Sequence, residues 1–187
     1  KLAMFNVSAI GLSLNPSAGL AYLVPRRLRQ NEKPRIVLDI SYRGLIELGV
    51  LSGSILWAKS ELVYSNDSFV YKGPAEKPDH VFDPFGTSQE RGDLRGAYCM
   101  AELTSGGYMI EPMSKADMDK IRDKSEAYKN NVGPWVDWPE QMQLKCPVKR
   151  GSKWWPKSSS KVADALKLLD RENGEGLAVL NINSNTV

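Results

Sequence analysis

The sequence has few of the residues that build metal, disulfide and acid–base sites. Its 187 residues include two cysteines and one histidine. Cys99 and Cys146 lie far apart and do not form the disulfide framework of a small secreted domain. With His80 they supply at most three ligands, which excludes a four-ligand zinc site of cysteine and histidine. This composition is typical of a reduced, cytoplasmic setting.

Long apolar runs are also missing. No run approaches the roughly 20 residues of a membrane-spanning helix, so no membrane span is expected. The first residues do not combine a basic stretch, an apolar stretch and a small-residue cleavage site, which excludes a signal peptide. Because the chain begins with Lys1, we expect it to be an internal or processed fragment.

Signatures of common DNA-processing enzymes are absent as well. The sequence has no Gly-x-x-x-x-Gly-Lys-Ser/Thr phosphate loop, which argues against ATP-driven recombination or unwinding of that design. Metal-dependent nucleases hold hard cations on converging carboxylates. No acid-x-Lys tripeptide occurs, so a nuclease is the weaker alternative. The acids on expected strands and loops are Asp39, Asp79, Asp83, Asp93 and Glu102.

Two reactive side chains also argue against catalysis. His80 lies in an irregular, proline-flanked segment, where a lone histidine is more often a surface residue than a general base. Cys146 has basic neighbours, which lower the pKa of a thiol, but no histidine near it in the sequence. The sequence therefore favours a binding protein over an enzyme.

Charged residues are segregated along the chain. Residues 141–163 hold six basic residues and no acid, and residues 25–35 hold five basic residues and one acid. These windows carry +6 and +4, so the rest of the chain carries −7 of the net +3. Such segregation suits a polyanionic ligand, although two solvated basic loops would give the same pattern.

Tryptophans interleave with the second basic window. Trp154 and Trp155 lie inside it, and Trp135 and Trp138 precede it. Single-stranded nucleic acid is bound by cations that contact phosphates and by aromatic rings that stack on bases. Core packing is the alternative explanation, and we expect it for two or three of the four rings.

Hydrophobic spacing and turn residues predict a mixture of helices and strands. We expect one hairpin from residues 55–64 and 69–72 and a second from residues 95–103 and 108–111. Residues 73–93 read as a long irregular loop. The other expected strands cover residues 20–24 and 35–41, and the other expected helices cover residues 1–11, 42–51, 114–128 and 158–171.

One further helix carries conflicting signals. It opens at residues 137–140 with an early proline, which a first helical turn tolerates. We expect Pro147 and Gly151 to break or kink it within the basic window. Just before it, Gly133-Pro134-Trp135 reads as a structural corner with Trp135 in the core. The order of all elements favours an α+β fold, a small antiparallel-rich sheet with hairpins flanked by helices.

Three segments in order resemble one protein family. The first combines residues 11–16 (GLSLNP) with residues 21–25 (AYLVP). The second is residues 38–48 (LDISYRGLIEL), and the third is residues 133–142 (GPWVDWPEQM), which leads into the basic window. In order and spacing they resemble the RecT family of phage and prophage single-strand annealing proteins, relatives of the Red-beta annealase.

The resemblance implies a recombination function. Members of this family bind single-stranded DNA without ATP and anneal complementary strands in phage homologous recombination. They form rings or helical filaments that hold DNA in a basic groove. They act together with an exonuclease partner and are found in the nucleoid of a bacterial host cell. We therefore expect neither ATP nor Mg²⁺ as a cofactor. The expected ligands are single-stranded DNA and an annealed duplex intermediate. Residues 1–156 would anneal and oligomerise, and residues 157–187 would add a helix and tail.

Seven basic residues are the candidate phosphate contacts. They come from the two basic windows and from the start of the helix over residues 42–51, where Arg43 could alternatively pack near Tyr42. For the others the alternative is solvated surface. The candidates are Lys145, Lys149, Arg150, Lys153, Arg26, Arg27 and Arg43.

Other functions fit parts of the pattern. A single-stranded DNA-binding module that protects without annealing is the first alternative, and a metal-dependent nuclease is the second. A virion structural protein would oligomerise without DNA. For an annealing protein we expect DNA to promote assembly, with subunit contacts in residues 73–93 and in the N-terminal helix.

Overall fold

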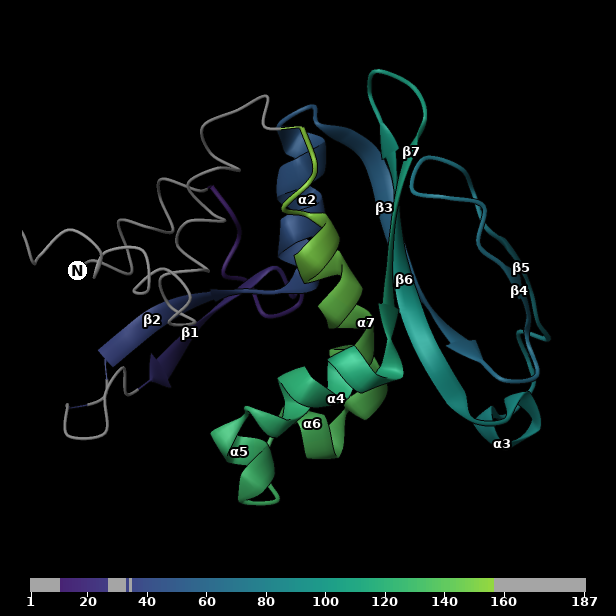
Figure 1. The fold of residues 1–187 in the computed structure, drawn as a ribbon. Coiled ribbons are helices and arrows are strands. Elements are labelled where there is room, and N and C mark those ends of the chain that lie inside the picture. Colours follow the sequence, from purple (N-terminus) through teal and green to yellow (C-terminus); the bar gives the residue numbers. More distant parts are fainter. Residues whose placement is uncertain (1–10, 27–32, 34, 157–187) are drawn as a thin grey trace, which may run out of the picture. The chain divides into compact units, whose positions relative to one another are not determined.

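The computed structural model describes residues 11–26, 33 and 35–156 (Figure 1). These residues form two compact units, one from residues 11–54 and one from residues 55–155. The helices expected over residues 1–11 (apart from Gly11) and 158–171 lie outside the described residues, as does the expected domain of residues 157–187. Among the described helices, none has the length and apolar character needed to cross a membrane.

A hairpin and a helix form the first unit. β1 (Ala21–Arg26) pairs antiparallel with β2 (Arg35–Ile40), and α2 (Tyr42–Leu51) follows directly. The Ser41 hydroxyl caps α2 by accepting a hydrogen bond from the Gly44 N–H (3.0 Å). These elements confirm the strands and the helix predicted here. The apolar core comprises Leu12, Ala21, Leu38, Ile40, Leu45 and Leu48.

A three-stranded antiparallel sheet organises the second unit. Its order is β3 (Ile55–Tyr64), β6 (Leu94–Leu103) and β7 (Tyr108–Ser114), with β6 in the centre. The β6–β7 pairing confirms the second predicted hairpin. Helices lie on one face of this sheet, and a two-stranded sheet lies over the other face (Figure 1).

The first predicted hairpin is wrong. β4 (Ser68–Val70) pairs with β5 (Asp79–Val81), and β3 pairs with β6 instead. The chain turns at Asp67, whose carboxylate accepts a hydrogen bond from the Tyr64 N–H (2.8 Å). Phe69 then packs against Tyr98 of the sheet, with ring centroids 5.4 Å apart. Burying these rings favours a strand laid over the face of the sheet, not added to its edge.

The segment over residues 73–93 is more regular than predicted. It contains β5 and the short helix α3 (Ser88–Arg91). Thr87 caps α3, and the Glu90 side chain bonds back to the Thr87 N–H in a capping box. The Thr-x-x-Glu spacing is the sequence pattern of a capping box and could have predicted this helix.

The outer edge of β7 is partly occupied. The Ile110 N–H donates a hydrogen bond to the Pro74 carbonyl oxygen (2.7 Å), from the segment that follows β4. Two residues further along β7 lies Pro112, which has no N–H. Donors two residues apart on a strand point to the same side, so Pro112 removes the next donor from this edge.

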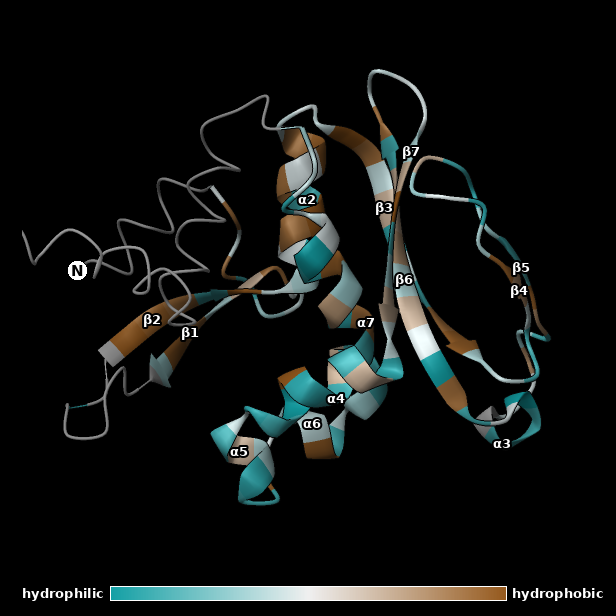
Figure 2. Cartoon of the chain, in the orientation of Figure 1, coloured by the Kyte–Doolittle hydropathy of each residue, from teal (hydrophilic) through white to brown (hydrophobic). Residues whose placement is uncertain are grey.

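Four helices follow the sheet, namely α4 (Lys115–Asp123), α5 (Glu126–Lys129), α6 (Pro134–Asp137) and α7 (Pro139–Gly151). The single helix predicted over residues 114–128 is therefore wrong. Ser114 caps α4, but Ser125 adopts extended backbone angles and caps α5. Serine favours such a cap over a helix interior. Figure 2 shows that α4 and α5 are largely hydrophilic.

The break predicted at Pro147 is also wrong, whereas α7 does end at Gly151. The helix continues through Pro147 to Gly151, and both residues are buried. A Cβ at Gly151 would lie 3.1 Å from the Cβ of Glu111, so glycine allows the last turn to approach β7 closely. Packing of α7 against the sheet outweighs the one helical hydrogen bond that Pro147 removes.

Helices and sheet share one apolar core in this unit. Trp135 is 8% exposed and belongs to it, as predicted for the Gly133-Pro134-Trp135 corner. Gly133 has a φ of 89°, which favours glycine, and Pro134 opens α6. The core cluster comprises Leu62, Tyr64, Ala97, Met113, Met118, Trp135 and Cys146.

Candidate nucleic-acid interface

One side of α7 is basic. The helix packs on β3, β6 and β7 through its buried residues, among them Cys146 and Val148. Lys145 and Lys149 are half-buried and lie four residues apart, so both project from the same side of the helix. The structure thus brings two of the seven predicted phosphate contacts together on one helical surface.

Arg150 has a structural partner. Its guanidinium forms an ion pair with Glu111 of β7 and also donates a hydrogen bond to the Pro112 carbonyl oxygen. These contacts tie the last turn of α7 to the edge strand. Sequence analysis missed this pair because 39 residues separate the two side chains.

Lys153 lies just beyond the end of α7, beside an exposed tryptophan. Both Lys153 and Trp154 are exposed, whereas Trp155 is buried. Of the four tryptophans around the basic window, Trp135 and Trp155 are buried, and Trp138 and Trp154 are 68% and 67% exposed. Core packing therefore accounts for two of the four rings, as expected.

The remaining candidates belong to the first unit. Arg26 ends β1 and Arg27 lies outside the described residues. Arg43 is exposed near the start of α2, and its guanidinium carbon lies 5.9 Å from the centroid of the Tyr42 ring. A hydrogen bond with Tyr42 raises the pKa of Arg43. This contact matches the alternative that Arg43 packs near Tyr42.

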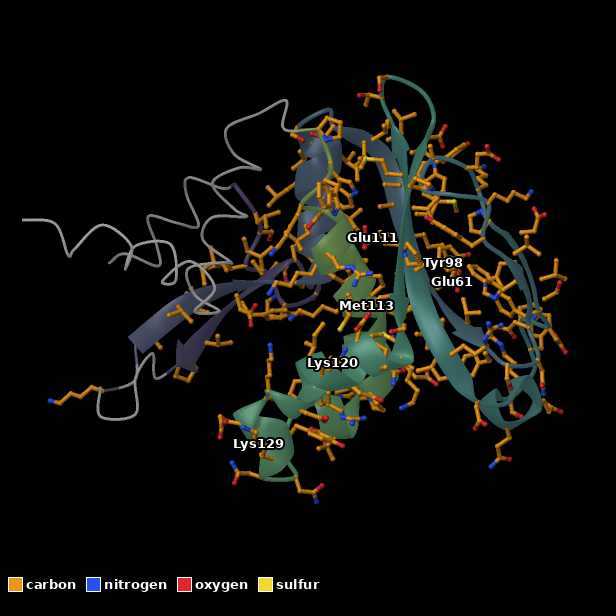
Figure 3. The ribbon with its side chains drawn as sticks, viewed as in Figure 1. Glu61, Tyr98, Glu111, Met113, Lys120 and Lys129 are labelled. Atoms are coloured by element: carbon orange, nitrogen blue, oxygen red, sulfur yellow. The ribbon has the colours of Figure 1, made fainter. Side chains whose placement is uncertain are left out.

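Basic residues on α4 and α5 pair with acids of their own helices. Lys120 pairs with Asp117 (3.1 Å), and Lys129 pairs with Glu126 (2.6 Å). Figure 3 labels both lysines on these helices. Charge on α4 and α5 is thus neutralised locally, which leaves α7 as the more basic surface of this unit.

A buried polar cluster connects β4, β5 and α3. The Asp67 side chain is 1% exposed and accepts hydrogen bonds from Arg91 Nη2 (2.6 Å) and from the Tyr64 N–H. The His80 side chain is 4% exposed and lies between Asp67 (3.1 Å) and the Tyr98 hydroxyl (3.3 Å). His80 is therefore no surface residue, which corrects the sequence-based expectation. Its burial leaves a substrate no access to the ring.

Asp67 should make the second unit sensitive to acid. Burial would raise the pKa of Asp67, but hydrogen bonds from Arg91, Tyr64 and His80 outweigh it and lower the pKa from 3.8 to about 2. A carboxyl with a depressed folded pKa stabilises the fold above about pH 4, and this contribution is lost as the pH falls through 2. It amounts to about 2 kcal/mol. Chemical denaturation at pH values from 5 to 2 measures the free energy of unfolding. This free energy should fall less with decreasing pH in Asp67→Asn than in the parent, and an equal fall in both would contradict this role.

Both cysteines are inert by burial. Burial raises the pKa of the Cys146 thiol to about 11 and outweighs the nearby Lys145 and Lys149, which lower it. Burial likewise raises the pKa of Cys99 to about 12. The basic neighbours of Cys146 thus lower its pKa, as considered from sequence, but burial has the larger effect. Within residues 11–26, 33 and 35–156, no group of three His, Cys, Asp or Glu side chains is placed to hold a metal ion.

The fold and the basic helix define a mixed α+β domain with a cationic surface on a sheet-packed helix. Comparison with known proteins then assigns the chain. The RecT family model matches residues 1–175. Protein RecT of Escherichia coli (strain K12) is 31% identical over 159 residues, which cover 83% of this chain and 57% of that protein.

The chain belongs to the RecT family. This confirms the resemblance seen in the three sequence segments. The chain spans a little over half the length of the RecT protein that it matches.

Proposed function

We propose that the chain binds single-stranded DNA and anneals complementary strands in homologous recombination. The family match over residues 1–175 carries this proposal. The basic side of α7 supports it, because Lys145 and Lys149 can neutralise phosphates while base edges stay free to pair. Phosphate neutralisation lowers the repulsion between two strands, and base pairing supplies the driving force. The reaction then needs neither ATP nor Mg²⁺.

Assembly is part of the proposal. One unit of this size contacts few nucleotides, so neighbouring subunits must extend the groove. The proposed assemblies are rings or helical filaments on DNA. An exonuclease partner would supply the resected ends, and the site of action would be the nucleoid of a bacterial cell.

A strand-pairing assay tests annealing directly. Two complementary labelled oligonucleotides, mixed at a concentration where they pair slowly, should pair faster with the protein and without nucleotide or Mg²⁺. Non-complementary oligonucleotides are the control. Binding of each strand without faster pairing would instead support the module that protects single strands, and cleavage of the label on adding Mg²⁺ would support a nuclease.

Charge reversal on α7 should weaken DNA binding. Lys145→Glu with Lys149→Glu should lower affinity for all base sequences alike, because phosphate contacts carry no sequence information. The slope of log affinity against log salt should fall by about 1.4, since each single-strand phosphate contact contributes about 0.7. Fluorescence anisotropy across a salt series measures both quantities.

Lys120→Glu with Lys129→Glu is the matched control. It makes the same charge change on α4 and α5, where both lysines pair with acids. We expect it to lower affinity less and to leave the salt slope close to the parent. Equal loss in both double variants would mean that net charge alone, and not the surface of α7, determines binding. Arg150 is unsuited to this test, because a glutamate there would face the half-buried Glu111, whereas the acids beside Lys120 and Lys129 are more exposed to water.

A further inference from the structure

The second unit carries a protruding phenyl ring and an apolar pocket. Phe85 lies between β5 and α3 and is 94% exposed. The pocket has a volume of about 280 Å³ and lies between β7 and the end of α7. We propose that Phe85 of one copy of this chain inserts into this pocket of the next copy. The proposal rests on the assembly proposed above and names the surfaces that would carry it.

Phe85 is held in its exposed position by the backbone around it. Its N–H donates a hydrogen bond to the Asp83 carboxylate (2.9 Å), and the Gly86 N–H donates one to the Asp83 carbonyl oxygen (3.2 Å). The capping box of Thr87 and Glu90 begins directly afterwards. Such a turn presents the ring in a fixed place, so docking would order few additional residues.

The pocket is suited to an aromatic ring. Its apolar walls include Met109, Ile110, Trp154 and Trp155, and the rim carries Glu111, which is already paired with Arg150. An apolar cavity of about 150 Å³ accommodates benzene, and this pocket is larger. Exposed aromatic residues that enter a desolvated pocket are typical anchors of protein interfaces.

Charge is complementary between the two surfaces. Residues 79–93, which include Phe85, hold four acids and one arginine. Residues 145–155, which contribute Gly151, Trp154 and Trp155 to the pocket, hold four basic residues and no acid, and the Glu111 that also lines the pocket is paired with Arg150. Asp83 and Glu90 are exposed beside Phe85, and Lys153 is exposed beside Trp154. Opposite charges around an apolar centre favour the docking of one surface on the other over the pairing of either surface with itself.

The two surfaces lie at different places on the second unit. Cys99, Glu111 and Gly151 line the pocket where α7 packs on the sheet, and Pro74 adds to it at the edge of β7. Phe85 lies in the segment between β5 and α3, and β5 lies on the side of the sheet away from α7 (Figure 1). A contact between two different patches of the same chain can repeat head-to-tail from copy to copy, which gives a ring or a helical filament.

Complementation between two variants tests the proposal. Phe85→Asp removes the ring and keeps the pocket, and Trp154→Glu adds like charge at the pocket and keeps the ring. Each side chain is more than half exposed, so each variant should fold. In sedimentation velocity, with and without oligonucleotides, each variant alone should associate at least roughly tenfold more weakly than the parent. A mixture of the two should form a one-to-one dimer and stop, because it contains one intact ring–pocket pair.

Val132→Asp and Val132→Glu are the controls, because they place the same charges at another exposed apolar position (57%). Both should assemble like the parent. Parent-like assembly of Phe85→Asp or Trp154→Glu, or a mixture that fails to pair, would overturn the docking and leave the proposed annealing intact. Assembly by Trp154→Glu with loss of DNA affinity would also overturn it and assign the pocket to a base. A parent that stays monomeric with both strands would contradict the proposed function itself.

Discussion

Replacing Trp135 with alanine should lower the free energy of unfolding by about 3–5 kcal/mol. The indole is 8% exposed and packs with the core cluster that joins β3, β6 and β7 to α4 and α7. Its removal leaves a cavity between helices and sheet that the rigid corner at Gly133 and Pro134 hinders from collapsing. Urea unfolding followed by circular dichroism measures the change.

Trp138→Ala is the matched control for that variant. Trp138 lies three residues further along and is 68% exposed, so its loss should change stability by less than about 0.5 kcal/mol. If the two variants unfold alike, Trp135 is no core residue. Its ring would then be available to DNA, and quenching of its fluorescence by an oligonucleotide would show it.

Arg91→Ala should destabilise the second unit by a similar amount, about 3–5 kcal/mol. Arg91 donates to both carboxylate oxygens of Asp67 and to the Leu62 carbonyl oxygen. Its guanidinium also lies 4.4 Å and 3.9 Å from the ring centroids of Tyr64 and Phe82. Removing it leaves the Asp67 charge buried with its strongest partner gone, and urea unfolding at neutral pH should show the loss.

Arg122→Ala is the comparison for this change. Arg122 also pairs with carboxylates, Asp119 and Asp123, and lies over the Tyr128 ring, but these carboxylates are 27% and 60% exposed, whereas Asp67 is 1% exposed. A pair whose carboxylates stay in contact with water contributes about 0–1 kcal/mol, so this variant should unfold almost like the parent. In a double-mutant cycle, Asp67→Asn should recover part of the loss caused by Arg91→Ala, because the buried charge is then absent. Additive losses would show that the two residues act independently.

Sequence patterns within one helix or one hairpin predicted the elements that form through contacts between residues close in the sequence. Apolar spacing over residues 42–51 predicted α2, and the turn residues 105–107 predicted the pairing of β6 with β7. The burial of Trp135 was predicted because its ring has a large apolar area and follows a Gly-Pro turn. Serine at position 125 also carried a cap signal, which helical periodicity over residues 114–128 obscured.

Features that depend on distant partners could not be predicted. Asp67 and Arg91 lie 24 residues apart, and only the packing of β4 and β5 over the sheet brings them together. Pro147 and Gly151 predict a break when read locally, whereas the sheet beneath α7 supports both residues. The same holds for Arg150, which was predicted to contact phosphate and pairs with Glu111 in the structure. Whether it also contacts DNA stays a prediction.

The proline at position 112 has a consequence for how this protein avoids aggregation. An unpaired strand edge is a template on which another chain can add a strand, and proteins that work at high local concentration need protection from it. On β7, one outward N–H is already bonded to Pro74 and the next is replaced by Pro112. A strand from another chain that paired with β7 would therefore lack hydrogen-bond donors at two consecutive outward positions. These two positions make the edge of β7 a poorer template for an added strand.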